Sequence, residues 1–338
     1  LVSIKRVITS REFANISGSG KLPIVVGRNS SGENMALDLA QMPHLLVAGS
    51  TGSGKSVFIN AIISCLIMCK TPSELRLMLV DPKRVELTPY NGIPHLLAPV
   101  VVETDEVVMY LKGLIREMQT RYRKMEGVGV RNIQSYNQKM SDKMPYLIVA
   151  IDELADLMMS ASYDIEQSLC RLAQLGRATG IHLIVATQRP SVDVVTGLIK
   201  ANFPTRTSFG VTSQIDSRTI LDATGAEKLL GKGDMLFMQA DASRPERVQG
   251  VFISDTEIEN LVRHWKNADW AALPKIDLEM SEDPLSKDQD DLSGNQNQFN
   301  SNDEMTDKAI NLAHQYKKLS TSLLQRRLRI GYPRAARL

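Results

Sequence analysis

Short apolar runs of strand length recur along most of the chain and alternate with longer amphipathic segments. Between residues 44 and 265 we predict strands over residues 45–48, 76–80, 146–151, 182–186, 207–211 and 235–238. Residues 105–125 carry apolar side chains at helical spacing, which predicts a helix with a single buried stripe. This alternation predicts an α/β fold in which a mostly parallel sheet has helices on both faces.

The pattern changes on both sides of this region. Residues 1–40 are predicted as a small β-rich lead-in, with the clearest strand over residues 22–27. Residues 277–304 are rich in Asp, Ser, Asn and Gln, and carry too few apolar side chains to offset the chain entropy of folding. We therefore predict a lead-in over 1–40, an α/β domain over 41–273, a flexible acidic linker over 274–304 and a C-terminal module over 305–338.

Length and composition are consistent with one large domain and an appendage. The chain has 338 residues, of which 43% are hydrophobic, and no apolar run reaches the length that a membrane span needs. The first residues lack a signal-peptide core and a starting Met, so we expect a fragment of a longer protein. Cys65, Cys69 and Cys170 fit neither a disulfide framework nor a zinc site, and we expect buried cytosolic thiols.

Charge is strongly segregated, although the net charge is only +2. Residues 277–307 contain ten acidic residues and one lysine, whereas residues 317–338 contain seven Lys and Arg residues and no acid. Residues 306–318 and 321–330 read as short helices, and a third helix is predicted to begin at Pro333. Short helices with a basic last element predict a partial helix-turn-helix module in which Arg326, Arg327 and Arg334 contact DNA.

A complete phosphate-binding motif, G-x-x-x-x-G-K-[ST], lies between an apolar run and a predicted helix. Its residues are Gly49, Ser50, Thr51, Gly52, Ser53, Gly54, Lys55 and Ser56. The glycines allow backbone N–H groups to surround phosphate oxygens at a helix N-terminus, and the alternative is a purely structural glycine turn. Lys55 is placed to bind the β- and γ-phosphates, and the Ser56 hydroxyl is placed to ligate Mg²⁺. The motif predicts that the chain binds a nucleoside triphosphate.

Two carboxylates follow the apolar strand at residues 146–151. Because the C-terminal end of such a strand faces the phosphate loop, Asp152 is predicted to hold Mg²⁺ through water. Glu153 is predicted to polarise the attacking water. The alternative is that these acids cap a helix over residues 154–159.

Other polar residues are candidates for contacts with the nucleotide or with DNA. Thr187 and Gln188 follow a strand and are candidate γ-phosphate sensors, with loop capping as the alternative. An arginine that compensates transition-state charge is also expected, although any single arginine can instead be a solvated surface group. The candidates are Arg177, Arg189, Arg206 and Arg218.

Three segments are less specific. The glycines of residues 228–234 and the charges of residues 244–247 indicate loops that, on one face of a ring, would follow a phosphate backbone. Asp81-Pro-Lys-Arg84 is placed near the nucleotide, but the sequence assigns it no role.

Several strings resemble the motor of the FtsK/SpoIIIE family of DNA translocases over roughly residues 20–265. They are Met42-Pro-His-Leu-Leu-Val-Ala48 before the phosphate loop, Asp81-Pro-Lys, and the segments 90–96, 130–133, 175–190 and 217–222. Residues 320–332 are similar to the opening of the family's C-terminal winged-helix (gamma) domain.

The resemblance implies a RecA-like P-loop ATPase that uses ATP and Mg²⁺. It implies a homohexameric ring around double-stranded DNA, which moves DNA in chromosome segregation during cell division. Full-length members carry N-terminal membrane helices, so we expect this part to lie at the cytoplasmic face of the bacterial inner membrane, with division-site or recombination proteins as further partners. By matching motif, Arg206 is predicted as the finger that acts across the subunit interface, and Arg218 and Arg247 are candidates for DNA-facing or interface roles.

Two alternatives remain open. One is a ring ATPase that moves protein substrates, as in related secretion motors. The other is a DNA-binding module with a degenerate nucleotide site, which the intact loop beside Asp152 and Glu153 disfavours. For the translocase we expect double-stranded DNA to stimulate hydrolysis, and Lys55→Ala to abolish hydrolysis while leaving the fold intact.

Overall fold

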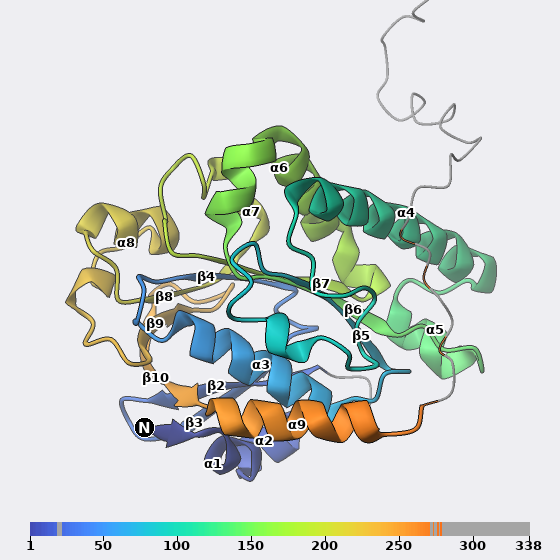
Figure 1. The fold of residues 1–338 in the computed structure, drawn as a ribbon, viewed down its shortest axis with the longest axis horizontal. Coiled ribbons are helices and arrows are strands. Elements are labelled where there is room, and N and C mark those ends of the chain that lie inside the picture. Colours follow the sequence, from blue (N-terminus) through green and yellow to red (C-terminus); the bar gives the residue numbers. More distant parts are fainter. Residues whose placement is uncertain (19–21, 271–272, 274–275, 277, 279–338) are drawn as a thin grey trace, which may run out of the picture. The chain divides into compact units, whose positions relative to one another are not determined.

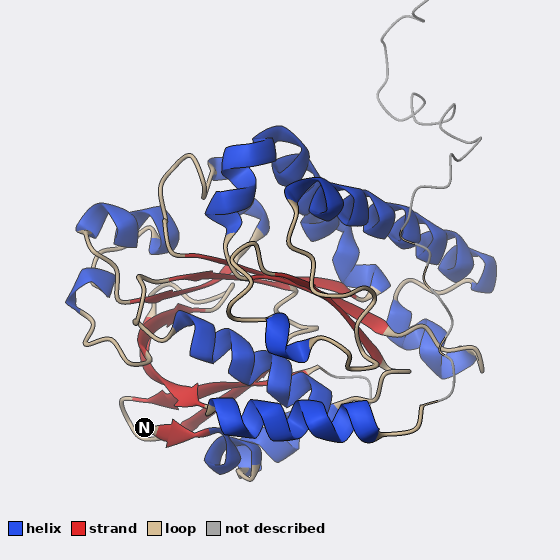
Figure 2. Ribbon diagram, in the orientation of Figure 1, coloured by secondary structure: helices blue, strands red, loops and turns tan. Residues whose placement is uncertain are grey.

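The computed structural model describes residues 1–18, 22–270, 273, 276 and 278. Within these residues the strands form one ten-stranded sheet (Figures 1 and 2). Its order is β3-β2-β10-β9-β8-β4-β7-β6-β5, with β1 paired to β10. The winged-helix segments, Arg326, Arg327 and Arg334 lie outside the described residues, as does nearly all of the predicted acidic linker.

One half of the sheet is parallel, as predicted. It contains β5 (Leu75–Val80), β6 (Tyr146–Ile151), β7 (Ile181–Thr187), β4 (His44–Ala48) and β8 (Thr205–Phe209). Four of these strands were placed to within a residue at each end, whereas β8 begins and ends two residues earlier than predicted. All five run in one direction, so their C-terminal ends meet at one edge of the sheet.

The other half is antiparallel, so the parallel part expected from the sequence is one half of a mixed sheet. It contains β9 (Asp234–Met238), β10 (Glu246–Phe252), β2 (Pro23–Asn29) and β3 (Asn34–Asp38). Only β1 (Val2–Ser3) runs parallel to its neighbour there. Hairpin connections such as residues 239–245 are too short for a crossover, so they join antiparallel strands. The predicted lead-in therefore adds β2 and β3 to the same sheet through β10.

Helices cover both faces of the sheet, as predicted (Figure 1). One face packs against α1 (Ile4–Ile8), α2 (Arg11–Ile16), α3 (Lys55–Cys69), α5 (Ile133–Lys139) and α9 (Asp255–Asn267). The opposite face packs against α4 (Thr104–Val128), α6 (Leu154–Thr179), α7 (Gly197–Asn202) and α8 (Gln214–Leu221). Short 3-10 turns occur at Thr88–Tyr90 and Ala226–Lys228. The parallel strands are buried on both faces, which explains their continuous apolar runs.

Two helices are longer than their sequence patterns indicated. Helix α4 extends the predicted stripe of residues 105–125 at both ends and stops at Gly129, whose φ of 71° is left-handed. Helix α6 continues well past residue 159, with a kink at Ala161 where φ is −145° and ψ is 54°. In the part of the chain that the structure describes, no helix combines the length and apolar character required to cross a membrane.

Candidate nucleotide-binding site

The phosphate loop leaves the C-terminal end of β4 and runs into α3, as the motif predicts. Its first residues are fastened to the neighbouring strands: the Gly49 amide donates to Thr187 O at 3.2 Å, and the Ser50 amide donates to Gly210 O at 2.9 Å. The loop is thus held at the tips of β7 and β8. The first N–H groups of α3 have no partner inside the helix, which leaves donors at the mouth of the loop for an anion.

A second glycine segment supports the loop from a distant part of the chain. Gly233 N donates to Ser53 O at 2.8 Å. Gly54 has a φ of 111°, and a Cβ placed on it would lie 2.5 Å from Gly233 N, so the two backbones touch. The sequence indicated only a basic turn over residues 228–234, whereas the structure places it against the phosphate loop.

Lys55 and Asp152 form a buried ion pair beneath the loop. Lys55 Nζ lies 2.7 Å from Asp152 Oδ1 and 2.7 Å from the Asp152 carbonyl oxygen. Both side chains are buried. Asp152 does not cap α6, as the alternative interpretation proposed, because the N-cap residue of α6 is Glu153.

The second carboxylate oxygen of Asp152 fits a magnesium ligand. Asp152 Oδ2 is buried and has no hydrogen-bond partner among the described residues. An unpartnered buried oxygen of this kind is costly, and hard oxygen ligands are what Mg²⁺ prefers. Ser56, the predicted hydroxyl ligand, is half-buried and lines the pocket described below. These two residues are suited to hold Mg²⁺.

Glu153 is buried in a network at the tips of β6 and β7. Its Oε1 accepts hydrogen bonds from Thr187 Oγ1 at 2.7 Å and from Gln188 N at 3.1 Å. Its Oε2 lies 3.1 Å from Lys83 Nζ. The same carboxylate also caps α6 by accepting from Ala155 N at 3.4 Å. The helix-cap reading of Glu153 therefore holds, and it coexists with a position beside the predicted sensors.

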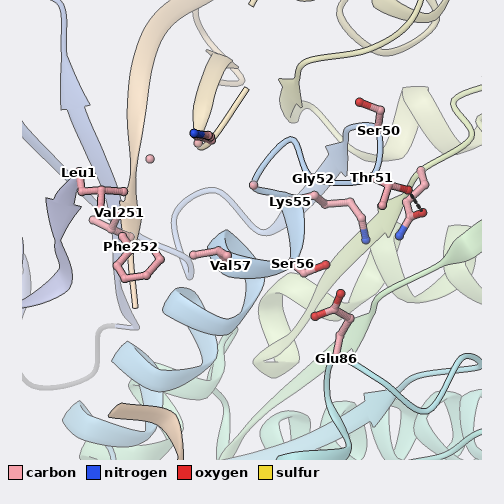
Figure 3. A pocket seen from close by; sticks show the side chains of 15 residues that line it. Leu1, Ser50, Thr51, Gly52, Lys55, Ser56, Val57, Glu86, Val251 and Phe252 are labelled. Carbon is pink, nitrogen blue, oxygen red and sulfur yellow. Dashed lines mark hydrogen bonds between the residues drawn. The ribbon is translucent and has the colours of Figure 1, made fainter. Parts of the chain in front are cut away.

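Gln188 reaches the phosphate loop directly. Its Oε1 accepts a hydrogen bond from Thr51 Oγ1 at 3.0 Å (Figure 3). Thr187 is buried and turned toward Glu153, so Gln188 is the one of the two candidates that faces the pocket. The sequence placed both residues correctly at a strand tip but could not distinguish them.

A pocket of about 410 Å³ opens over the loop. Its lining residues are Leu1, Ser50, Thr51, Gly52, Gly54, Lys55, Ser56, Val57, Glu86, Gln188, Lys232, Gly233, Gly250, Val251 and Phe252. Lys55, Ser56 and Glu86 lie on one side, whereas Val57, Val251 and Phe252 lie on the other (Figure 3). The pocket thus has a polar side at the phosphate loop and an apolar side, as expected for a site that takes a nucleotide.

Comparison with known proteins decides the family. The sequence matches the FtsK/SpoIIIE family over residues 3–192 and the Ftsk gamma domain over residues 300–338.

The chain belongs to the FtsK/SpoIIIE family.

Curated relatives in this family align with the whole chain. The DNA translocase SpoIIIE of Bacillus subtilis (strain 168) is 49% identical over 348 residues, which cover 100% of this chain and 42% of that protein. The DNA translocase FtsK of Brucella melitensis biotype 1 is 46% identical over 374 residues, covering 99% of this chain and 44% of that protein. The chain therefore spans less than half the length of these FtsK/SpoIIIE relatives.

Solved structures show that the fold is that of RecA-like P-loop ATPases. The pCW3 conjugation coupling protein TcpA, solved with ATPγS, has a TM-score of 0.65 at 29% identity, covering 77% of this chain and 76% of TcpA. The cytoplasmic domain of the Type VII secretion ATPase EccC of Thermomonospora curvata also has a TM-score of 0.65, at 25% identity. That match covers 73% of this chain and 31% of EccC.

Arg206, the predicted finger of this FtsK/SpoIIIE-family chain, is bound by its own chain. Its guanidinium donates to Phe203 O at 3.0 Å and to Ile220 O at 3.2 Å, and it forms an ion pair with Asp222. The side chain is only 13% exposed. Burial alone would raise the pKa of Asp222, but hydrogen bonds from Lys200 and Arg206 lower it below the ordinary value.

Arg206 also lies near the start of β8, whereas the phosphate loop meets the opposite end of that strand. The contacts of Arg206 within its own chain are those of a structural residue. Its action across a subunit interface stays a prediction.

The predicted DNA-facing arginines lie in different surroundings. Arg218 is exposed on α8. Arg247, on β10, is bidentate on Asp234, with N–O distances of 3.0 and 2.7 Å. The hydrogen bond from Arg247 lowers the pKa of Asp234 below its ordinary value. Of the other arginine candidates, Arg177 and Arg189 are exposed. DNA contact by Arg218 and Arg247 stays a prediction.

Proposed function

We propose that this chain is the ATP-hydrolysing part of a double-stranded DNA translocase. The observation that carries the proposal is that Lys55, Asp152 and Glu153 converge on the strand edge that holds the phosphate loop, with no described residue donating to Asp152 Oδ2. These groups supply the cation, the metal ligand and the acceptor that triphosphate cleavage requires. Relatives over the whole chain that are named DNA translocases support the choice of DNA as the moved polymer.

Each residue of the site has a defined task in this proposal. The loop amides and Lys55 bind the phosphates of ATP, and the apolar wall formed by Val57, Val251 and Phe252 receives the rest of the nucleotide. Asp152 and Ser56 hold Mg²⁺, which neutralises charge on the phosphate oxygens when bound. Glu153 accepts the proton of the attacking water, and Gln188 senses the γ-phosphate from its place beside Thr51.

The assembly and cellular setting are further parts of the proposal. We place the chain in a homohexameric ring around duplex DNA, with Arg218, Arg247 and the C-terminal Arg326, Arg327 and Arg334 toward the polyanion. We place it at the cytoplasmic face of the inner membrane, where it moves chromosomal DNA during division alongside division-site or recombination proteins. Arg206 as the interface finger is part of the same proposal, although its guanidinium is already bound within one chain.

A ring ATPase that moves protein is the second candidate, and the likeness to the secretion ATPase EccC favours it. Sequence identity distinguishes the protein-moving candidate from the DNA translocase. The EccC likeness rests on 25% identity over 73% of this chain, whereas the translocase relatives are 46–49% identical over 99–100% of it. Translocation of DNA is therefore the better supported function.

Stimulation of hydrolysis by DNA is the test. We expect ATPase activity to rise when linear duplex DNA is added at low salt and to fall again at high salt, because phosphate contacts release counterions. Electron microscopy with duplex and a non-hydrolysable ATP analogue should show closed rings threaded by DNA. ATPase activity that duplex leaves unchanged at low salt would contradict the proposal, and stimulation by a secreted protein would favour the second candidate.

A further inference from the structure

The segment Asp81-Pro-Lys-Arg84, to which the sequence assigned no role, forms a rigid turn after β5. Asp81 is buried, and its Oδ2 accepts hydrogen bonds from the backbone N–H groups of Glu86 and Leu87, both at 2.9 Å. The Arg84 amide donates to Asp81 O at 3.1 Å, and Arg84 has a φ of 59°. A buried carboxylate therefore fixes the turn from which Lys83 projects.

Lys83 projects from this turn to the tip of β6. Its Nζ lies 3.1 Å from Glu153 Oε2 and 4.0 Å from Asp156 Oδ2, so it sits between two carboxylates. The Lys83 side chain is 39% exposed, whereas that of Glu153 is 1% exposed. An ammonium that remains in contact with solvent thus covers one oxygen of a carboxylate that is otherwise enclosed by protein.

Glu153 has no acceptor site left for water in this arrangement. A carboxylate offers about four lone-pair positions. Donors already occupy them: Thr187 Oγ1 and Ala155 N on Oε1, Gln188 N shared between both oxygens, and Lys83 Nζ on Oε2. A general base must accept a hydrogen bond from the water whose proton it takes. At least one of these donors must therefore leave before Glu153 can act.

Lys83 is the donor best able to leave. Two of the others are backbone amides at the start of α6 and the end of β7, and Thr187 is a buried strand residue. Lys83 is a long, half-exposed side chain with a second acceptor, Asp156, within reach. Moving its ammonium toward Asp156 keeps the positive charge in contact with water, because the Lys83 and Asp156 side chains are 39% and 33% exposed. Glu153 then keeps three hydrogen-bond donors, Thr187 Oγ1, Ala155 N and Gln188 N.

We propose that Lys83 is a positioning residue that withholds Glu153 from the attacking water, so that hydrolysis begins only when the Lys83 ammonium leaves Glu153 Oε2. The inference rests on the proposed ATPase function and adds a restraint to it. The anionic triphosphate and the Asp156 carboxylate are the acceptors that draw Lys83 away. No bond is made or broken in this step, and only the hydrogen-bond donor on Oε2 changes.

Steady-state ATP hydrolysis by the full chain without DNA is the experiment. Lys83→Met keeps the length of the side chain but removes the ammonium. We expect it to raise kcat about two- to fivefold with little change in KM, which is the effect of removing one half-exposed ion pair from a resting equilibrium. Lys83→Arg restores a cation at Oε2 and should keep kcat at or below the wild-type value.

Arg84→Met is the matched control. It removes one positive charge from the same turn, but Arg84 pairs with Glu103, and both side chains are largely exposed. We expect its kcat to equal that of the wild type. The double variant Lys83→Met with Glu153→Gln should lose the gain in kcat, because the gain acts through Glu153.

A Lys83→Met kcat that is unchanged or lower than wild type would overturn the inference, as would a gain that survives in the Glu153→Gln background. In either case the proposed function would stand, because the wild-type chain hydrolyses ATP. A wild-type chain that hydrolyses no ATP, with or without DNA, would overturn the proposed function and this inference with it. A merely structural Lys83 would lower activity on substitution and would not raise it.

Discussion

Lys55 Nζ and Asp152 Oδ1 are 2.7 Å apart, and both side chains are buried beneath the phosphate loop. The lysine that we propose to bind phosphate is therefore neutralised by the carboxylate that is expected to hold Mg²⁺. When a nucleotide binds, Lys55 has to move from Asp152 to the phosphates, and Asp152 has to bind the metal instead. Each of the two buried charges is thus compensated before any substrate arrives, and removal of either partner would leave the other uncompensated.

Lys55→Ala is expected to abolish hydrolysis and also to destabilise the fold. From the sequence we expected the fold to be unaffected, but the substitution leaves the Asp152 carboxylate buried and unpaired. Breaking a buried pair in this way costs about 3–5 kcal/mol of unfolding free energy. Urea unfolding of the purified variant measures the cost.

The double variant Lys55→Ala with Asp152→Ala is the matched control. It removes both charges, so its unfolding free energy should lie above that of Lys55→Ala alone, while both variants stay inactive. Equal stabilities of Lys55→Ala and the wild type would show that the pair contributes nothing to folding.

Removal of Mg²⁺ by a chelator should abolish hydrolysis, because the negative charge on the phosphates then lacks its counter-ion. Ser56→Ala should raise the Mg²⁺ concentration needed for half-maximal activity, since one of the two proposed oxygen ligands is lost. Titration of the ATPase rate with Mg²⁺ measures the shift. Ser50→Ala removes a hydroxyl that donates to Gly210 O at 2.9 Å and should leave the Mg²⁺ requirement unchanged. A parallel shift in both variants would argue against Ser56 as a ligand.

Gly233→Ala is expected to weaken ATP binding although it lies outside the motif. Gly233 has a φ of 93°, and a Cβ there would lie 2.8 Å from Gln249 Nε2, so the turn that supports Ser53 must shift. Backbone strain of this kind costs about 1–3 kcal/mol, which corresponds to a loss of ATP affinity of about 5- to 150-fold if the phosphate loop bears all of it. Binding of a fluorescent ATP analogue measures the affinity. Gly197, with open space around its Cβ position, is the control, and Gly197→Ala should bind normally.

Arg206→Ala should lower the unfolding free energy by about 2 kcal/mol, because hydrogen bonds from a mostly buried guanidinium to Asp222 and to backbone carbonyls are lost. Arg218→Ala, on an exposed position, should change stability little. Mixing Arg206→Ala and Lys55→Ala chains tests the interface role separately. Recovery of ATPase activity in the mixture would mean that Arg206 acts on a neighbouring subunit, and no recovery together with lowered stability would fit a structural residue.

Stability should fall between pH 7 and pH 5 because three buried histidines stay neutral in the fold. Burial lowers the pKa of His44 to about 3, and the pKa values of His95 and His182 to about 4. In the unfolded chain these rings titrate near 6.5, so below that pH the unfolded state binds more protons. Their contribution is fully present above pH 6.5 and is lost as the pH falls toward 4.

Each of these histidines is expected to cost up to about 2 kcal/mol between pH 7 and pH 5. Urea unfolding at the two pH values measures the sum. His182→Gln should remove the part of the pH dependence of the unfolding free energy that His182 contributes. Substitution of the exposed His264 should leave the pH dependence unchanged. If the unfolding free energies of the wild type and His182→Gln depend equally on pH, burial of His182 is not a cause of the pH dependence.

Much of the fold and half of the site could be predicted from local pattern. The parallel strands are recognisable because burial on both faces forces continuous apolar runs, and β4, β5, β6 and β7 were placed to within a residue at each end. In the antiparallel half, strands over residues 22–27 and 235–238 were predicted, but β10 was not, and the loop expected over residues 244–247 was wrong because β10 begins at Glu246. The pairing of β2 with β10 was not predicted because the two strands are far apart in sequence. Their pairing depends on a register that no local spacing encodes.

The sequence by itself determined which chemical groups are present: the phosphate loop, the acids at the end of β6 and the polar pair at the end of β7. Residue types, and the places along the chain where buried strands end, can be recognised from local pattern alone. Only the tertiary structure decided what each group contacts. It joined Lys55 to Asp152, Lys83 to Glu153 and Gly233 to the loop, and it bound Arg206 within its own chain. Such contacts depend on how elements distant in sequence pack in three dimensions, and a buried charge takes the partner that this packing brings within reach.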